Sequence, residues 1–270
     1  ARLAGVPVRV AHAHKSSDGR ADSPTRHLYR AAMRRAIAEH ATLVLACSGA
    51  AASVFDAPNT RLLPYGVDLR PFAATSAIER AQLGIPPDAP VLGAVGRLTR
   101  QKNHKFLLDA FTAALRLRPD LHLIVAGEGE LAPELERRTR APELAGRVHL
   151  LGARDDVPAL LTGLCDGFVM PSLHEGLPVA LLEAQAAGLP CLISDAISTE
   201  AIALPEQVQR LPLSGPWGRA LASLPDNRRL DPRIAVERLR AAGFDIEQSW
   251  PRLTALYERQ LTARGSAQAA

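Results

Sequence analysis

The sequence predicts an α/β protein with a doubly wound parallel sheet. From Val91 onward, short continuous apolar segments alternate with amphipathic segments long enough to form helices. Continuous apolar strands are typical of a parallel sheet covered by helices on both faces. Of the 270 residues, 47% are hydrophobic and 22% charged, which excludes a disordered, collagen-like or coiled-coil chain. Ligands are expected at the carboxyl ends of such strands.

Each predicted strand of this domain precedes a predicted helix. Strands are expected at residues 91–96, 121–127, 148–152, 167–172, 191–194 and 208–211. Helices are expected at residues 103–117, 130–141, 157–164 and 178–187, with further helices after the last two strands. This repeated strand–helix unit makes residues 91–245 one domain.

The residues before Val91 predict a smaller unit. Strand-like segments at 6–14 and 42–48 flank an Arg-rich helix at about 24–40. We therefore divide the chain into an incomplete first domain at 1–75, a proline-rich linker at 76–90, the domain at 91–245 and a final segment at 246–270. The final segment is expected to be helical to about Thr262. Because the chain starts almost directly in a strand, we expect it to be cut inside a larger fold.

Charge, cysteine content and hydropathy bear on the partners and the compartment of the protein. The net charge of +4 does not demand a nucleic-acid partner. Cys47, Cys165 and Cys191 each lie in or beside an apolar segment, which predicts buried thiols in a reducing compartment. No apolar segment reaches the length that spans a bilayer. We expect a cytoplasmic protein.

The segment PSLHEGLPVALLEAQAAGLPCLIS, residues 171–194, is the most informative. Pro178 is expected as the first helical residue, so Gly176 and Leu177 would offer backbone N–H groups to phosphate oxygens at a positive helix end. The carboxylates of Glu175 and Glu183 could accept hydrogen bonds from sugar hydroxyls. Taken singly, either glutamate could instead be a helix-dipole or solvated residue. Their spacing within one strand–loop–helix unit favours the binding interpretation.

A second motif, GAVGRLTRQKNH, occupies residues 93–104. Gly96 ends a strand and allows a ligand close to the backbone, while Asn103 is a predicted helix N-cap. Arg97 and Lys102 could together neutralise a diphosphate. Both cations could instead be ordinary surface charges, but the strand order would place this loop beside the first motif.

Two further loops follow predicted strands. Gly127 begins a G-x-G-x-x-A pattern, but the acidic residue that a dinucleotide site needs is missing after the next strand, so NAD is not expected. Gly127 is expected to let a ligand pass, and the loop from Gly152 to Asp155 to hold a base through backbone groups.

The smaller unit offers two candidate features. His12 and His14 alternate at a strand end, so both could point into one cleft, and structural histidines are the alternative. Arg26, Arg30, Arg34 and Arg35 follow helical spacing, which usually means a solvated face; an anionic membrane surface is the less favoured reading. No His/Cys cluster or D-x-D motif predicts a metal site.

Together these motifs resemble the donor-binding half of family-four glycosyltransferases with the GT-B fold, in the bacterial exopolysaccharide and capsule subgroup. The resemblance rests on GRLTRQKNH, DVPALL, PSLHEGLPVALLEAQAAGLPCLISDAIS and the upstream VRVAHAHKSS, and extends over about residues 5 to 225. It implies a complete C-terminal Rossmann-like domain and the remnant of an N-terminal one, with the final segment 246–270 packing back onto that remnant. The glycine-rich acceptor loop with which such proteins open is absent from this sequence.

The resemblance also implies residue roles. Arg97 and Lys102 would bind the diphosphate and balance the leaving nucleotide, Glu175 would hold the donor sugar, Glu183 would hold the ribose, and His14 or His12 would lie nearest the reacting sugar. The donor site implied by the resemblance comprises Gly96, Arg97, Lys102, Gly127, Gly152, Arg154, Asp155, Val157, Ser172, Glu175, Gly176, Leu177 and Glu183.

The implied reaction is retaining, metal-independent and cofactor-free. It would transfer a sugar from a nucleotide-diphosphate sugar, a UDP-sugar being favoured, to a lipid-linked polysaccharide precursor at the inner face of the cytoplasmic membrane. The departing phosphate would assist attack from the same face. Two alternatives stay open: a sugar-nucleotide epimerase on the same fold, and a non-catalytic donor-binding remnant.

Overall fold

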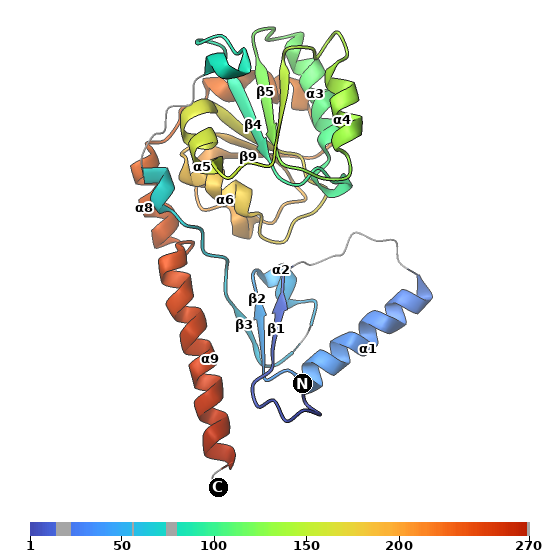
Figure 1. Cartoon of the computed structure of the whole chain (residues 1–270), viewed down its shortest axis with the longest axis vertical. Coiled ribbons are helices and arrows are strands. Elements are labelled where there is room, and N and C mark those ends of the chain that lie inside the picture. The colour runs from blue at the N-terminus through green and yellow to red at the C-terminus, as the bar shows by residue number, and fades with distance from the viewer. Residues whose placement is uncertain (15–22, 56, 74–79, 269–270) are drawn as a thin grey trace. The chain divides into compact units, whose positions relative to one another are not determined.

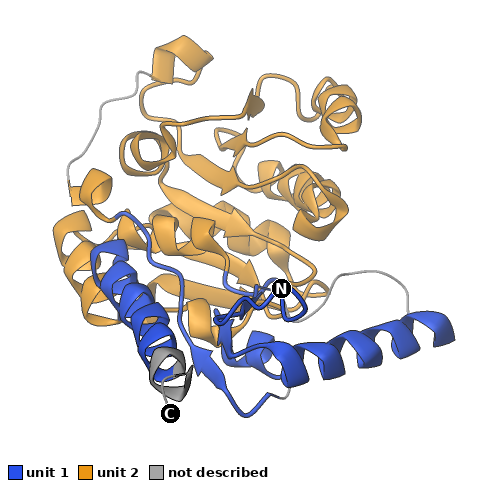
Figure 2. Ribbon diagram, turned by 60° about the horizontal axis from the view of Figure 1, so that its bottom comes forward, with its two compact units in different colours: residues 1–68, 175–177, 243–270 blue, residues 69–174, 178–242 orange. Residues whose placement is uncertain are grey.

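The computed structural model describes residues 1–14, 23–55, 57–73 and 80–268, with side chains to residue 263. Contacts divide the chain into two units, coloured separately in Figure 2. Unit 1 comprises Ala1–Asp68, Glu175–Leu177 and Gly243–Ala270, and unit 2 comprises Leu69–His174 and Pro178–Ala242. Residues 69–90, which we assigned to the first domain and a linker, therefore fall in unit 2 where they are described; residues 74–79 lie outside the described residues.

Unit 2 contains a six-stranded, fully parallel sheet in the order β6-β5-β4-β7-β8-β9 (Figure 1). Its strands are β4 (Val91–Val95), β5 (His122–Ala126), β6 (Val148–Gly152), β7 (Gly167–Met170), β8 (Cys191–Ser194) and β9 (Val208–Leu211). The first three strands add outward from the middle in one direction and the last three in the other. The doubly wound parallel sheet predicted from the sequence is confirmed.

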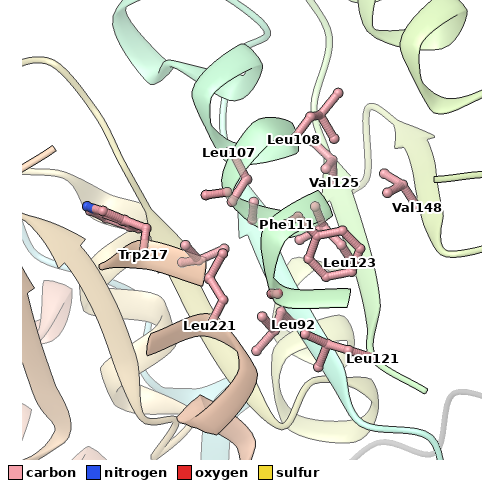
Figure 3. Close-up of a cluster of buried hydrophobic side chains, with 14 of the residues drawn as sticks. Leu92, Leu107, Leu108, Phe111, Leu121, Leu123, Val125, Val148, Trp217 and Leu221 are labelled. Atoms are coloured by element: carbon pink, nitrogen blue, oxygen red, sulfur yellow. The ribbon is translucent and has the colours of Figure 1, made fainter. Parts of the chain in front are cut away.

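Helices cover this sheet and fill its core. They are α3 (His104–Leu115), α4 (Ala132–Thr139), α5 (Val157–Ala159), α6 (Val179–Ala186), α7 (Trp217–Ser223) and α8 (Pro232–Ala241). Helices α3 and α7 pack against each other, and Phe111 and Trp217 meet Leu92 and Leu123 of the strands in one apolar cluster (Figure 3). Burial of these side chains drives the helices onto the sheet.

Unit 1 contains three parallel strands in the order β1-β2-β3. They are β1 (Val10–Ala13), β2 (Leu43–Ala46) and β3 (Thr60–Leu62), and the helices are α1 (Pro24–His40), α2 (Gly49–Ala52) and α9 (Ile246–Gln268). Helix α1 begins at the predicted residue because the Ser23 hydroxyl accepts from the Arg26 amide and Pro24 occupies the first turn. Residues 15–17 of the VRVAHAHKSS motif lie outside the described residues.

The structure corrects several element predictions. Strand β3 was missed, and α9 extends beyond Thr262 to Gln268. The connection from β8 to β9 holds two 3₁₀ turns, Thr199–Ala201 and Pro205–Gln207, in place of the expected helix. Pro178 is the N-cap of α6 rather than its first residue. After α5, residues Leu160–Leu164 continue as a π-helix.

The three cysteines are free thiols in the interior. Cys165 lies against Gly93 of β4, where an added Cβ would come within 2.6 Å of its sulfur. Glycine in the middle of this strand therefore gives room to a thiol. Among the described residues, no helix combines the length and hydropathy needed to cross a membrane.

Candidate functional site

Strand order in unit 2 reverses between β4 and β7, so the loops after these two strands lie at the sheet's topological switch point. Hydrogen bonds join them. The Leu173 amide donates to the Gln101 carbonyl at 2.8 Å, and the Gln101 side chain donates to the His174 carbonyl at 2.8 Å. The Asn103 side chain donates to the Pro171 carbonyl at 3.2 Å. Two loops far apart in sequence therefore form one rim.

Lys102 lies over the end of β4. A Cβ added to Gly96 would come within 3.1 Å of Lys102 Cε and 3.4 Å of its Nζ. The lysine ends a short 3₁₀ helix, Arg100–Lys102, and is followed by Asn103 at φ 59°. Asn103 is the predicted N-cap of α3, but its side chain bonds Pro171 across the rim and makes no capping bond. This left-handed turn directs Lys102 back across the strand end.

Arg97 and Glu183 are charged candidates of unit 2 whose side chains have no bonding partner among the described residues. Arg97 is exposed, and Glu183 is half-buried on α6; the side chain of neither makes a hydrogen bond or ion pair with another described residue. Burial raises the pKa of Glu183. A partly buried carboxylate such as that of Glu183, desolvated without a hydrogen bond or ion pair to compensate, is typical of a ligand site.

Gly127 links three strand ends. Its amide donates to the Gly152 carbonyl at 2.7 Å, while the Gly96 amide donates to the Ala126 carbonyl at 3.0 Å. A Cβ on Gly127 would come within 2.0 Å of the Gly96 carbonyl oxygen. We expected this glycine to leave room for a ligand, but the space beside it is occupied by the backbone that carries Gly96.

The loop after β6 is organised by an ion pair. Arg154 donates from Nε and Nη2 to the two carboxylate oxygens of Asp156, at 2.8 and 2.6 Å. The arginine holds the pKa of the Asp156 carboxyl below its usual range. Gly152 has φ +65° with open space where a side chain would lie, and Val157 starts α5. Arg154, a predicted donor-binding residue, thus has its guanidinium turned to Asp156, while Asp155 is exposed.

The loop after β7 is divided between the two units. Ser172 belongs to unit 2, is 0% exposed, and its carbonyl accepts from the Ser194 hydroxyl at 2.5 Å. Glu175, Gly176 and Leu177 belong by their contacts to unit 1. Unit 2 therefore contains the residues that form the rim, together with Arg97, Lys102 and Glu183. Glu175 belongs to unit 1.

Unit 1 has a pocket of about 250 Å³ at the carboxyl ends of its strands and the start of α9. Both candidate histidines line it, and their rings stack with centroids 5.7 Å apart. His12 Nε2 lies 3.1 Å from the Tyr257 hydroxyl, and His14 Nδ1 lies 2.5 Å from the Tyr65 hydroxyl. The two histidines, which we predicted could share one cleft, both line this pocket.

Three residues near these sites were missed from the sequence. Tyr65 and Trp250 line the unit 1 pocket, and the buried His104 lies beside Lys102. Tyr65 follows an apolar pair directly after the missed strand, and His104 follows the predicted N-cap, so position relative to an element end was the available signal. In the described parts of the chain, no three His, Cys, Asp or Glu residues gather as metal ligands would.

Comparison with known proteins gives consistent results. Residues 75–208 match the family model described as glycosyl transferases group 1. The chain is 37% identical over 269 residues to the putative glycosyltransferase EpsF of Bacillus subtilis, covering 95% of this chain and 70% of that protein. It is 39% identical over 140 residues to the Escherichia coli UDP-Gal:alpha-D-GlcNAc-diphosphoundecaprenol alpha-1,3-galactosyltransferase, covering 50% of this chain and 36% of that one.

Among solved structures, HepE of Anabaena in complex with UDP matches with a TM-score of 0.74 and 21% identity, over 93% of this chain and 72% of that chain. At this identity, the likeness bears on the fold alone. The GT-B-type α/β class predicted from the sequence is thereby confirmed.

Proposed function

Because the chain belongs to the glycosyl transferases of group 1, we propose that it transfers a sugar from a UDP-sugar, with retention of configuration, to a lipid-linked glycan. The family resemblance stated from the sequence is confirmed, and with it the assignment to the sugar transferases. The observation that carries the finer proposal is Lys102, held over Gly96 at the switch point of the sheet. An ammonium group there can neutralise charge that develops on a departing diphosphate.

The donor roles follow from charge and position. Lys102 and Arg97 bind the diphosphate, because Arg97 is exposed beside Gly96 and offers a fork of donors. Glu183 accepts from the ribose hydroxyls, which would compensate the desolvation of its carboxylate. The roles of Glu175 at the donor sugar, and of the Gly176 and Leu177 backbone amides at phosphate oxygens, are proposed from the family resemblance alone.

The chemistry needs no resident cofactor in this proposal. As the glycosidic bond breaks, additional negative charge develops on the diphosphate. Lys102 and Arg97 stabilise this charge, so they stabilise the transition state more than the bound substrate. The departing phosphate oxygen then accepts the proton of the attacking hydroxyl on the same face. In unit 1, His14 is assigned to the acceptor side because it lines the pocket there.

Donor binding is tested by calorimetric titration with UDP. We expect Lys102→Met and Arg97→Ala each to weaken UDP affinity at least tenfold, and Glu183→Gln about fivefold, since each removes a charged hydrogen bond. Lys105→Met is the matched control, because Lys105 lies three residues away and pairs with Glu134 at 2.7 Å on the surface. Equal affinity of all variants would refute the assignment.

The reaction is tested with UDP-sugars and two acceptors, an undecaprenyl-diphosphate saccharide and the same saccharide without its lipid. The diphosphoundecaprenol in the name of the Escherichia coli relative supports the lipid-linked choice. We expect transfer to the lipid-linked acceptor with the donor's anomeric configuration kept, read by proton NMR of the product. Conversion of the donor without any acceptor would indicate an epimerase, and tight UDP binding without transfer would indicate a non-catalytic binder.

Contact with an anionic membrane surface is a further part of the proposal. Helix α1 has no buried residue and exposes Leu28 by 74% and Tyr29 by 65%, along with Arg34 and Arg35. Apolar and cationic side chains on one helix fit the interface of an anionic bilayer. We expect flotation with vesicles containing phosphatidylglycerol, loss of flotation in Arg34→Glu, and none with pure phosphatidylcholine. Arg137→Glu, on α4 of unit 2, is the charge-matched control.

A further inference from the structure

A small pocket of about 10 Å³ lies in unit 2 beside Lys102. Its walls come from the end of β4, the end of β7 with the two residues that follow it, and the start of α3. Lys102, His104 and Ser172 supply its polar side chains, and the rest of the lining is apolar. The volume is about what a single water molecule occupies.

Two of these side chains bring unpaired polar atoms to the pocket. His104 is 4% exposed and Ser172 is 0% exposed. His104 Nδ1 and Ser172 Oγ make no hydrogen bond with any described residue. Leaving a polar atom buried without a partner costs about 1–3 kcal/mol, so native proteins rarely do so without a bound water or a functional reason.

The charge state of His104 limits what it can do. Burial and the nearby positive charge of Lys102 together lower its pKa to about 4. The imidazole is therefore neutral at pH 7, and its Nδ1 can accept a hydrogen bond when the proton is on Nε2. A neutral acceptor beside an ammonium group attracts that group without cancelling its charge.

We propose that one water molecule in this pocket connects His104 and Ser172 to Lys102, and that these two residues thereby position the lysine ammonium group over Gly96. The water accepts a hydrogen bond from Lys102 Nζ and donates to His104 Nδ1 and to Ser172 Oγ. Three polar partners are typical for a buried water. His104 and Ser172 are then positioning residues, whose effect on the diphosphate passes through Lys102. The inference rests on the proposed function at that point.

A double-mutant cycle on UDP affinity tests this dependence. We expect His104→Leu to weaken UDP binding about tenfold in the otherwise native chain and less than twofold in the Lys102→Met background, because the lysine to be positioned is then gone. His104→Asn keeps a polar atom near the place of Nδ1 and is expected to restore affinity to within about threefold. Equal losses in both backgrounds would overturn the inference.

Ser172→Ala gives a second route if His104→Leu fails to fold. It removes one oxygen from a buried position and creates almost no cavity. We expect a three- to tenfold loss of UDP affinity that again disappears in the Lys102→Met background. Unchanged affinity in Ser172→Ala would count against the proposed water bridge.

Nitrogen NMR of the ligand-free protein separates this inference from the proposed function. The imidazole ¹⁵N resonances of His104, assigned by their loss in His104→Asn, should report a neutral ring with Nδ1 as acceptor. They should shift in Ser172→Ala and in Lys102→Met but not in Lys105→Met. If they shift while Lys102→Met leaves UDP affinity intact, the positioning stands and the diphosphate role of Lys102 fails. If neither variant shifts them, the positioning itself is wrong.

Discussion

Substituting Gly127 by alanine should disrupt both the fold of unit 2 and the binding of UDP. The added Cβ would lie 2.0 Å from the Gly96 carbonyl oxygen and 2.8 Å from its carbonyl carbon. Real Cβ atoms essentially never come closer than 3.0 Å, so the Gly96 backbone must move by at least 1.0 Å. The φ angle of +145° adds strain for any residue with a side chain.

The expected magnitude follows from these two costs. Overpacking that forces a backbone shift costs about 1–3 kcal/mol, and holding a non-glycine residue in this backbone region costs a further 1–3 kcal/mol or so. We therefore expect Gly127→Ala to lower the free energy of unfolding of unit 2 by about 2–6 kcal/mol. Because Lys102 lies against Gly96, this displacement should also weaken UDP binding about tenfold, comparable to loss of the ammonium group in Lys102→Met.

Urea unfolding of unit 2 can be followed by the fluorescence of Trp217, in a Trp250→Phe background that removes the tryptophan of unit 1. Gly146→Ala is the matched control, because Gly146 has φ +71° and nothing within 4 Å of an added Cβ. It should cost about 1 kcal/mol and leave UDP affinity unchanged. If Gly127→Ala is no less stable than Gly146→Ala and binds UDP equally well, the steric argument is refuted.

Three further outcomes are expected. Gly96→Ala should weaken UDP binding with a smaller loss of stability than Gly127→Ala, because its Cβ meets the flexible side chain of Lys102; calorimetry and urea unfolding check this. Arg229→Met should lower the unfolding free energy by about 2–4 kcal/mol, since the guanidinium donates to four backbone carbonyls, including Thr162 at 2.9 Å. Burial and nearby positive charge lower the pKa of His122 to about 4. Between pH 6.5 and 4, His122 is therefore protonated in the unfolded chain but not in the folded protein, so the free energy of unfolding should fall as the pH drops through this range. In His122→Leu, the number of protons taken up on unfolding, measured from the slope of that free energy against pH, should be smaller by about one.

The strands of unit 2 could be predicted because each is buried on both faces and is therefore a continuous apolar segment. The missed strand, β3, has the sequence Thr-Arg-Leu, and two of its three residues are exposed. Nothing in so short and polar a segment distinguishes it from a loop, since its pairing with β2 is a tertiary interaction. The helix expected between β8 and β9 is replaced by two 3₁₀ turns; Ser198 caps the first and Pro205 begins the second.

The residue types of the candidate site could be predicted, but not their partners. Local spacing identified Arg97 and Lys102 as charges beside a strand end and Glu183 as a charge within the following helix of the other motif. The Arg-Asp-Asp segment at 154–156 offers Arg154 two carboxylates as partners, and the structure pairs it with Asp156. Such a choice depends on dihedral angles that the sequence pattern does not specify.

Gly96, Gly127 and Gly152, at the ends of β4, β5 and β6, are connected by a series of backbone contacts. The Gly152 carbonyl accepts from the Gly127 amide, the bare Cα of Gly127 admits the Gly96 carbonyl, and the bare Cα of Gly96 admits the Lys102 side chain. The position of one ammonium group therefore depends on backbone contacts across three strands. A ligand that fixes Lys102 must also restrain these strand ends, because the same contacts act in both directions. This accounts for glycine at Gly96 and Gly127 without requiring that either touch the ligand, while the φ of +65° accounts for Gly152.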